Sequence, residues 1–226
     1  GWSIKDMHRL IMTSAAYRQA SVASPAAIEA DPNNELVSLM ALRRIRAEEL
    51  NDRMLSVASR LATSMFGRPD PVSVRSDGLV TPREVDGGWR RSIYVMHRRK
   101  EIPTVLETFD QPAMNPNCEQ RATSTVAQQA LYLLNDTRVR QLSESFASRV
   151  AAQADNPTDQ VKLAIMLAYG RPARSDERQL GVEALAEFAQ AWQGQLPAKK
   201  GVSAAQQALQ TYCHTLLNSA EFLYVD

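Results

Sequence analysis

The sequence has 226 residues, 44% hydrophobic and 23% charged, so it holds enough apolar side chains for one substantial core or two small ones. Lys and Arg number 26 against 25 Asp and Glu, and a chain of net charge +1 lacks the positive field that gathers nucleic acid, which argues against a nucleic-acid partner. No run approaches the roughly 18 apolar residues that cross a bilayer, so we expect no membrane span.

We expect one domain, residues 1–226, and the start at Gly1 in place of methionine indicates that it is a piece of a longer protein. The helical N-terminal part of this domain covers residues 1–62. Apolar residues at helical spacing predict one helix over residues 3–20, and beyond an Asp-Pro-x-Asn turn they predict a long amphipathic helix over residues 36–61.

An irregular insert with a β element follows over residues 63–121. Prolines and glycines interrupt this part at short intervals, which is typical of turns. Between them we expect a brief strand at residues 72–74 and a short turn of helix at residues 104–109. A longer strand is expected at residues 89–97, where β-branched and aromatic residues gather.

The helical C-terminal part covers residues 122–226. The predicted helices are one that Thr125 opens, one that carries Val139, Leu142, Phe146 and Val150 on its apolar face, and then residues 158–169, 175–192 and 204–218. Gly170 is placed as a helix C-cap. The predicted fold class is therefore mainly α: a multi-helical domain with a small β element in the middle of the chain.

The histidines and cysteines do not form a recognisable metal or haem site. His8, His97 and His214 lie on three separate predicted elements, without the spacing of zinc ligands. Cys213-His214 resembles the end of a haem attachment sequence, but Gln210 stands where its first cysteine belongs. Since a glycine-rich phosphate loop and a nucleophile elbow are also missing, the sequence predicts no catalytic, cofactor-binding or metal-binding residue.

One stripe of charged residues permits three interpretations. Arg44, Glu48 and Asp52 follow one another at four-residue spacing along the predicted long helix. They form either a solvated face or a desolvated network, in which the two carboxylates receive arginines from the middle segment, such as Arg91 and Arg121. Two carboxylates on one stripe are also the groups of a glycosidase-like acid and base.

Motifs spread along the whole chain carry a family resemblance. They are Trp2-Ser3-Ile4-Lys5-x-Met7-His8-Arg9-Leu10-Ile11-Met12, Arg44-Ile45-x-Ala47-Glu48-x-Leu50-x-Asp52, Arg91-Ser92-Ile93-Tyr94, Cys118-x-x-Arg121, Gln129-Ala130-Leu131-x-Leu133-Leu134-Asn135, Gly170-Arg171-Pro172 and Leu216-Leu217-Asn218-Ser219-x-Glu221-Phe222-Leu223-Tyr224. Together they resemble the planctomycete-associated domain of unknown function 1553. One departure is Asn51, which stands where an arginine is common in that family.

The resemblance implies a setting and no mechanism. Similar domains lie at the C-terminus of long exported bacterial proteins, often with a cytochrome-c-like domain near the N-terminus, which implies a periplasmic or cell-surface location. We therefore expect a non-catalytic structural or interaction module, without a cofactor, whose partners are other domains of the parent chain, a cytochrome-c-like domain among them. The alternative is a polysaccharide-binding or polysaccharide-processing domain. A cleft lined by Trp2, Trp89 or Trp192 would favour that alternative, and buried tryptophans would favour the module.

Two further expectations concern stability. An exported parent would permit a disulfide between Cys118 and Cys213, and the alternative is that each cysteine is a small buried hydrophobe. The C-terminal Phe222-Leu223-Tyr224 is predicted to dock into the core, because three large apolar side chains in a row would favour aggregation if they were exposed.

Overall fold

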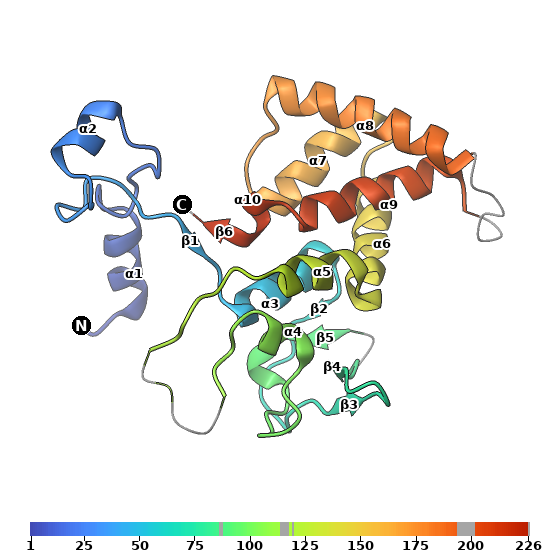
Figure 1. Cartoon of the computed structure of the whole chain (residues 1–226), viewed down its shortest axis with the longest axis horizontal. Helices are drawn as coiled ribbons and strands as arrows, with labels where there is room; N and C mark the ends of the chain where they lie inside the picture. Colours follow the sequence, from blue (N-terminus) through green and yellow to red (C-terminus); the bar gives the residue numbers. More distant parts are fainter. Residues whose placement is uncertain (86–87, 114–117, 119, 194–201, 226) are drawn as a thin grey trace. The chain divides into compact units, whose positions relative to one another are not determined.

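The computed structural model describes residues 1–85, 88–113, 118, 120–193 and 202–225. These residues form two compact units, and each is described by itself: a small unit of residues 1–44 with 224–225, and a large unit of residues 45–223. Helices dominate and the strands are short (Figure 1), so the predicted mainly α class with a small β element is confirmed. The single domain with its three parts stays a prediction.

The small unit contains short helices and one pair of strands. Its elements are α1 (Ile4–Met12), α2 (Pro25–Ala30), β1 (Arg43–Arg44) and β6 (Tyr224–Val225), and β1 and β6 run antiparallel. The side chain of Ser3 accepts a hydrogen bond from the Asp6 backbone N–H and so caps α1.

The first predicted helix, over residues 3–20, is shorter in the structure, since α1 ends at Met12. Just beyond its end, the Thr13 hydroxyl donates to the Arg9 carbonyl oxygen and the next serine donates to that of Ile11, each at 2.7 Å. Such side-chain hydrogen bonds compete with a further helical turn for the same carbonyl groups.

The long helix predicted over residues 36–61 is wrong in its first half. The Asp31 carboxylate accepts hydrogen bonds from backbone N–H groups four and five residues later, at 2.8 and 2.9 Å. The Asn34 side chain accepts another from the Leu39 N–H at 3.2 Å. These side chains hold the backbone in turns, so the helix begins only at Ala47.

The first half of the large unit combines α3 (Ala47–Val57) with short strands. The strands are β2 (Leu61–Ala62), which pairs in parallel with β5 (Trp89–Arg90), and β3 (Val72–Val74), which pairs antiparallel with β4 (Val80–Pro82). The brief strand predicted at residues 72–74 is therefore confirmed, as is the short helix near residue 104, α4 (Thr104–Thr108). The strand predicted at residues 89–97 is wrong beyond its second residue, because the chain turns into a 3₁₀ helix, η1 (Ser92–Tyr94), whose first N–H donates to a carboxylate of α3.

The second half of the large unit is helical, as predicted. Its helices are α5 (Ala127–Asn135), α6 (Thr137–Ala151), α7 (Pro157–Tyr169), α8 (Ser175–Gln193), α9 (Ala204–Leu217) and α10 (Ala220–Leu223). Helices α6 and α8 pack on α9, and α7 packs on α8 (Figure 1). Gly170 ends α7 at a φ of 74°, a left-handed conformation that glycine adopts without strain, as the sequence predicted. Asn156 caps α7, which begins at Pro157, one residue before the predicted start at residue 158.

The core of the large unit draws on both halves. Leu55 of α3, Phe146 of α6 and Val161 of α7 are all fully buried. Phe222 of α10 is fully buried too, and the guanidinium group of Arg53 lies 4.6 Å from the centroid of its ring. The predicted docking of the C-terminal segment is therefore confirmed for Phe222, whereas Leu223 and Tyr224 are only half-buried. No helix in the described ranges combines the length and the apolar character needed to cross a membrane.

Candidate functional site

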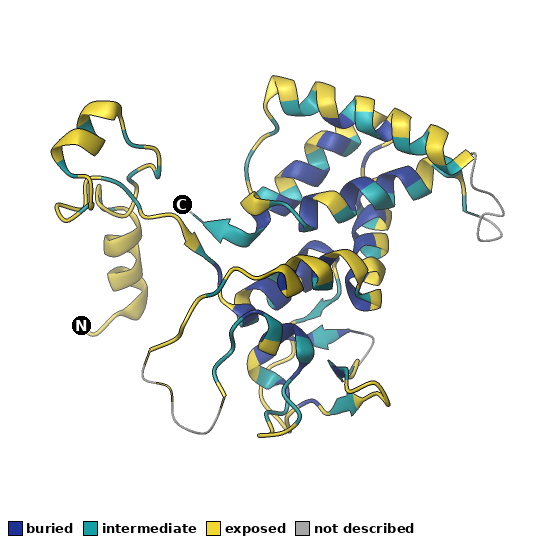
Figure 2. Ribbon diagram, in the orientation of Figure 1, coloured by how far each residue is buried: buried dark blue, intermediate teal, exposed yellow. Residues whose placement is uncertain are grey.

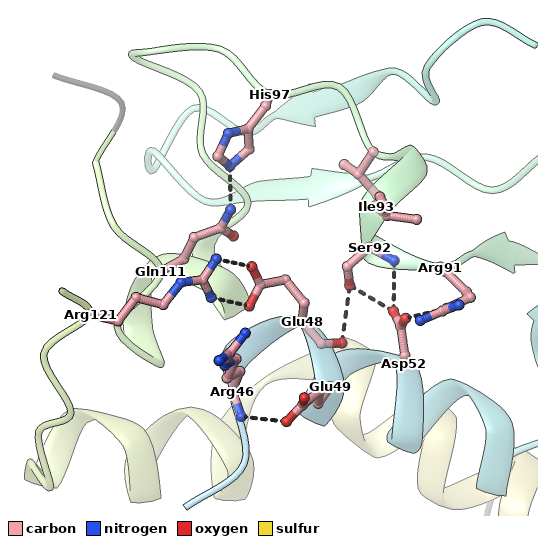
Figure 3. A pocket seen from close by; sticks show the side chains of 11 residues that line it. Arg46, Glu48, Glu49, Asp52, Arg91, Ser92, Ile93, His97, Gln111 and Arg121 are labelled. Atoms are coloured by element: carbon pink, nitrogen blue, oxygen red, sulfur yellow. Dashed lines mark hydrogen bonds and ion pairs between the residues drawn. The ribbon is translucent and has the colours of Figure 1, made fainter. Parts of the chain in front are cut away.

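A cavity of about 640 Å³ lies in the large unit, between the first turns of α3 and the segment around η1 (Figure 3). It is lined by Arg46, Glu48, Glu49, Asp52, Arg91, Ser92, Ile93, Val95, His97, Gln111 and Arg121. The described part of the chain brings together here four of the five charged residues that the sequence singled out, which makes this cavity the candidate site.

Glu48 and Arg121 form a two-pronged ion pair on one side of the cavity. The two terminal nitrogens of Arg121 donate to the two carboxylate oxygens of Glu48, both at 2.8 Å, as Figure 3 shows. Burial raises the pKa of Glu48, but the hydrogen bonds and charge of Arg121, a backbone hydrogen bond and the charge of Arg46 together outweigh this effect, so the pKa lies below its ordinary value. Glu48 therefore stays ionised near neutral pH and has no proton to donate as a general acid.

Asp52, one turn along the same helix face, receives three donors from the η1 segment. Its Oδ1 accepts hydrogen bonds from the Ser92 backbone N–H at 2.6 Å and from the Ser92 hydroxyl at 2.8 Å, and its Oδ2 accepts one from Arg91 Nε at 3.1 Å. The two carboxylates thus fasten separate segments to α3. Such fully engaged carboxylates act as structural cross-links and are poorly placed to exchange protons with a substrate.

A buried polar chain continues behind Asp52. Asn51 Nδ2 donates to Ser92 Oγ, and Asn51 Oδ1 accepts from Arg138 Nη1, each at 2.9 Å. Arg138 is only 7% exposed, its guanidinium group lies 5.0 Å from the centroid of the Trp89 ring, and burial lowers its pKa. Its Nε and Nη2 have no hydrogen-bond partner among the described residues. The chain links α3, η1 and α6 through one buried cation.

The histidines do not assemble a reactive centre in the described residues. Gln111 Nε2 lies 2.7 Å from His97 Nε2, at the edge of the cavity. His214 Nε2 lies 2.8 Å from the Leu133 carbonyl oxygen, far along the chain, and His8 is exposed on α1. No group of three or more potential metal ligands is found within the described ranges.

Arg44 is the predicted site residue that the structure places elsewhere. It lies on β1 in the small unit, whereas Glu48 and Asp52 lie on α3 in the large unit. The predicted stripe of three charges on one helix is therefore wrong. The stripe required one helix that includes residues 44, 48 and 52, but the helix begins only at Ala47.

Two ion-pair clusters were missed from the sequence. Arg171 donates to Glu177 at 2.6 and 2.8 Å and to Glu221 at 2.5 and 2.7 Å, which ties the α7–α8 connection to α10. Arg90 donates from Nε to both oxygens of Asp70, at 2.9 and 3.1 Å, and both residues are buried. Arg171 lies in the Gly170-Arg171-Pro172 motif and Arg90 directly precedes the Arg91-Ser92-Ile93-Tyr94 motif. This position in or beside a family motif was the sequence signal that could have indicated both clusters.

Both cysteines are free thiols in the structure, which therefore contains no disulfide between Cys118 and Cys213. Cys118 is exposed, and its Sγ donates to the carbonyl oxygen of Gln120 at 2.9 Å. Cys213 lies on the fully buried face of α9, where burial raises the pKa of its thiol. The buried-hydrophobe alternative describes Cys213 and does not describe Cys118.

The comparison with protein families agrees with the motifs. The family model PSD1, a protein of unknown function (DUF1553), matches residues 1–185. The chain belongs to this family. All residues that line the cavity fall within the matched range, whereas the closing motif at residues 216–224 lies beyond it. No curated protein and no solved structure matches the chain.

Proposed function

We propose that this PSD1 chain is a non-catalytic structural and interaction module at the C-terminus of a larger exported, cytochrome-associated bacterial protein. The setting of the proposal, with export and a cytochrome-c-like neighbour, is supported by the family resemblance. The part that concerns the chain itself is supported by its surface and by the state of its charged groups.

The observation that carries the proposal is the uncovered apolar face of α1. Ile4, Met7, Leu10 and Ile11 recur at helical spacing and expose 72%, 56%, 68% and 48% of their surface. No residue of α1 is buried, and Figure 2 shows the helix in the colour of exposed residues throughout. A contiguous exposed apolar face is typical of a surface that binds another protein.

The candidate site supports the non-catalytic part of the proposal. Both oxygens of Glu48 are taken by Arg121, and Asp52 accepts three hydrogen bonds. An acid and base pair needs one carboxyl group that holds a proton at working pH, and the lowered pKa of Glu48 works against this.

The test is binding in trans between this chain and the remainder of its parent. The remainder, expressed separately, should co-purify with the chain. Leu10→Asp should weaken this association, because it places a charge on the exposed apolar face of α1. Leu180→Asp is the matched control, since Leu180 is 63% exposed on α8. Equal binding by Leu10→Asp and the unmodified chain would overturn the proposal.

A second candidate, polysaccharide binding, is favoured by one observation. A cavity of about 640 Å³ is lined by Trp89 together with Glu84 and Glu144. The ring of Trp89, however, is already covered by Arg60, whose guanidinium group lies 5.3 Å from the ring centroid and pairs with Glu84. Arg60→Ala would uncover the part of the ring on which Arg60 lies, so stronger retardation of this variant in polysaccharide-containing gels would support the candidate. Equal mobility with and without polysaccharide, for variant and unmodified chain alike, would exclude it.

A further inference from the structure

The cavity at the start of α3 has arginine hydrogen-bond donors that its paired carboxylates do not use. The carboxylates of Glu48 and Asp52 are fully engaged by neighbouring donors. Arg91 uses only Nε in that network, so the edge formed by its two terminal nitrogens is left, and its side chain is 66% exposed. The guanidinium group of Arg46 makes no hydrogen bond or ion pair with any residue in the described ranges, although its charge lowers the pKa of Glu48.

We propose that this cavity is a receptor for the carboxylate of an acidic side chain on a partner polypeptide. The proposal rests on the proposed function as an interaction module and names the chemistry that the partner brings. The open edge of the Arg91 guanidinium matches the two oxygens of a carboxylate, and Arg46 adds a second positive charge in the same cavity.

The lining of the cavity favours a polypeptide over a sugar acid. None of the lining residues that the structure describes is Phe, Tyr or Trp, so a sugar ring lacks the large aromatic face on which it usually packs. The apolar part of the lining is aliphatic and consists of Ile93, which is 78% exposed, and the buried Val95. This surface suits the methylene groups of an aspartate or glutamate side chain.

Two lining groups oppose a carboxylate ligand: Gln111 Oε1, an acceptor without a hydrogen-bond partner among the described residues, and the carboxylate of Glu49. Glu49 is exposed, and its Oε2 accepts a hydrogen bond from the Arg46 backbone N–H at 3.0 Å, which caps α3. Glu49→Gln keeps an acceptor for this cap and removes a negative charge from the cavity. The variant should therefore bind an acidic peptide more tightly than the unmodified chain.

The test is an NMR titration of the whole chain with an end-blocked tetraglutamate peptide. The matched tetraglutamine peptide, tetragalacturonate and inorganic phosphate are the comparison ligands. Tetraglutamate should shift resonances of the cavity residues, and Arg46→Gln and Arg91→Gln should each weaken its binding about tenfold or more, as loss of an interface arginine does. Arg75→Gln, an exposed arginine outside the cavity, should leave binding unchanged.

The outcomes separate this inference from the proposed function. No binding of tetraglutamate, equal binding of tetraglutamine, or stronger binding of tetragalacturonate or phosphate would each overturn the inference. Because Arg91 also holds Asp52, an unfolded Arg91→Gln variant would leave Arg46→Gln and Glu49→Gln to decide. If the remainder of the parent still binds the chain while tetraglutamate does not, only the inference fails, whereas insensitivity to Leu10→Asp removes the proposed function itself.

Discussion

The ion pair between Glu48 and Arg121 should measurably stabilise the large unit, although it is not fully buried. We expect Glu48→Ala and Arg121→Ala each to lower the free energy of unfolding, and the double variant to lose less than the sum of the two. The reason is that both single variants remove the same two hydrogen bonds of 2.8 Å.

The exposure of the two side chains sets the size of this effect. Glu48 is 27% exposed and Arg121 is 40% exposed. Exposed pairs contribute about 0.2–1 kcal/mol, and breaking a buried pair costs about 3–5 kcal/mol. For this half-exposed, two-pronged pair we expect a coupling energy of about 1–2 kcal/mol, which corresponds to roughly 2–8 °C in the melting temperature of a unit of this size.

Differential scanning calorimetry of the four proteins in the double-mutant cycle measures the coupling. The pair Arg98 and Glu101 is the matched control, because it has a similar distance of 2.9 Å but 57% and 34% exposure and only local sequence separation. Its coupling should stay near that of an ordinary exposed pair. A Glu48–Arg121 coupling no larger than that of the control would refute the interpretation of the cavity wall as a structural cross-link.

Three further predictions concern packing, acid stability and the thiols. Phe222→Ala should lower the free energy of unfolding by about 3–5 kcal/mol, because the side chain is fully buried. The control is Phe66→Ala, because Phe66 is exposed, and equal melting temperatures of the two variants would contradict the prediction. The hydrogen bonds from Arg171 hold the pKa of Glu177 at about 2 in the folded protein. The pair therefore stabilises the fold fully above the unfolded pKa of about 4.3, and this stabilisation is lost as the pH falls from there towards about 2. Glu177→Gln should flatten the pH dependence of the melting temperature in this window, and an unchanged slope would count against the pair. Denatured, unreduced protein should titrate as two free thiols, whereas native Cys213 should stay unreactive; finding none in the denatured protein would show a disulfide.

The helices of the second half were predictable because their signals are local. Apolar residues at helical spacing mark α6 and α9, and Gly170 stands where α7 must end. The first half was predicted less well, because side-chain hydrogen bonds override a helical pattern. Asp31 and Asn34 capture backbone N–H groups in turns, and no count of apolar spacing reveals this.

The candidate site could be anticipated only in part. The four-residue spacing of Glu48 and Asp52 places both on one face of a helix, and the motifs indicated Arg91 and Arg121 as their partners, 39 and 73 positions away. The buried chain from Asn51 to Arg138 was not anticipated, because a polar residue at a buried helix position has the same sequence signature as one at an exposed position. Only the three-dimensional packing distinguishes the two.

Hydrogen exchange of the α1 amides tests the central claim most directly. The claim is that the apolar face of α1 docks on another domain of the parent protein. The account predicts that the amides of residues 4–12 exchange rapidly in this chain alone and are strongly protected in the full-length parent, with α9 as an internal reference that is protected in both. Equally rapid exchange of residues 4–12 in the two proteins, with α9 unchanged, would contradict the account.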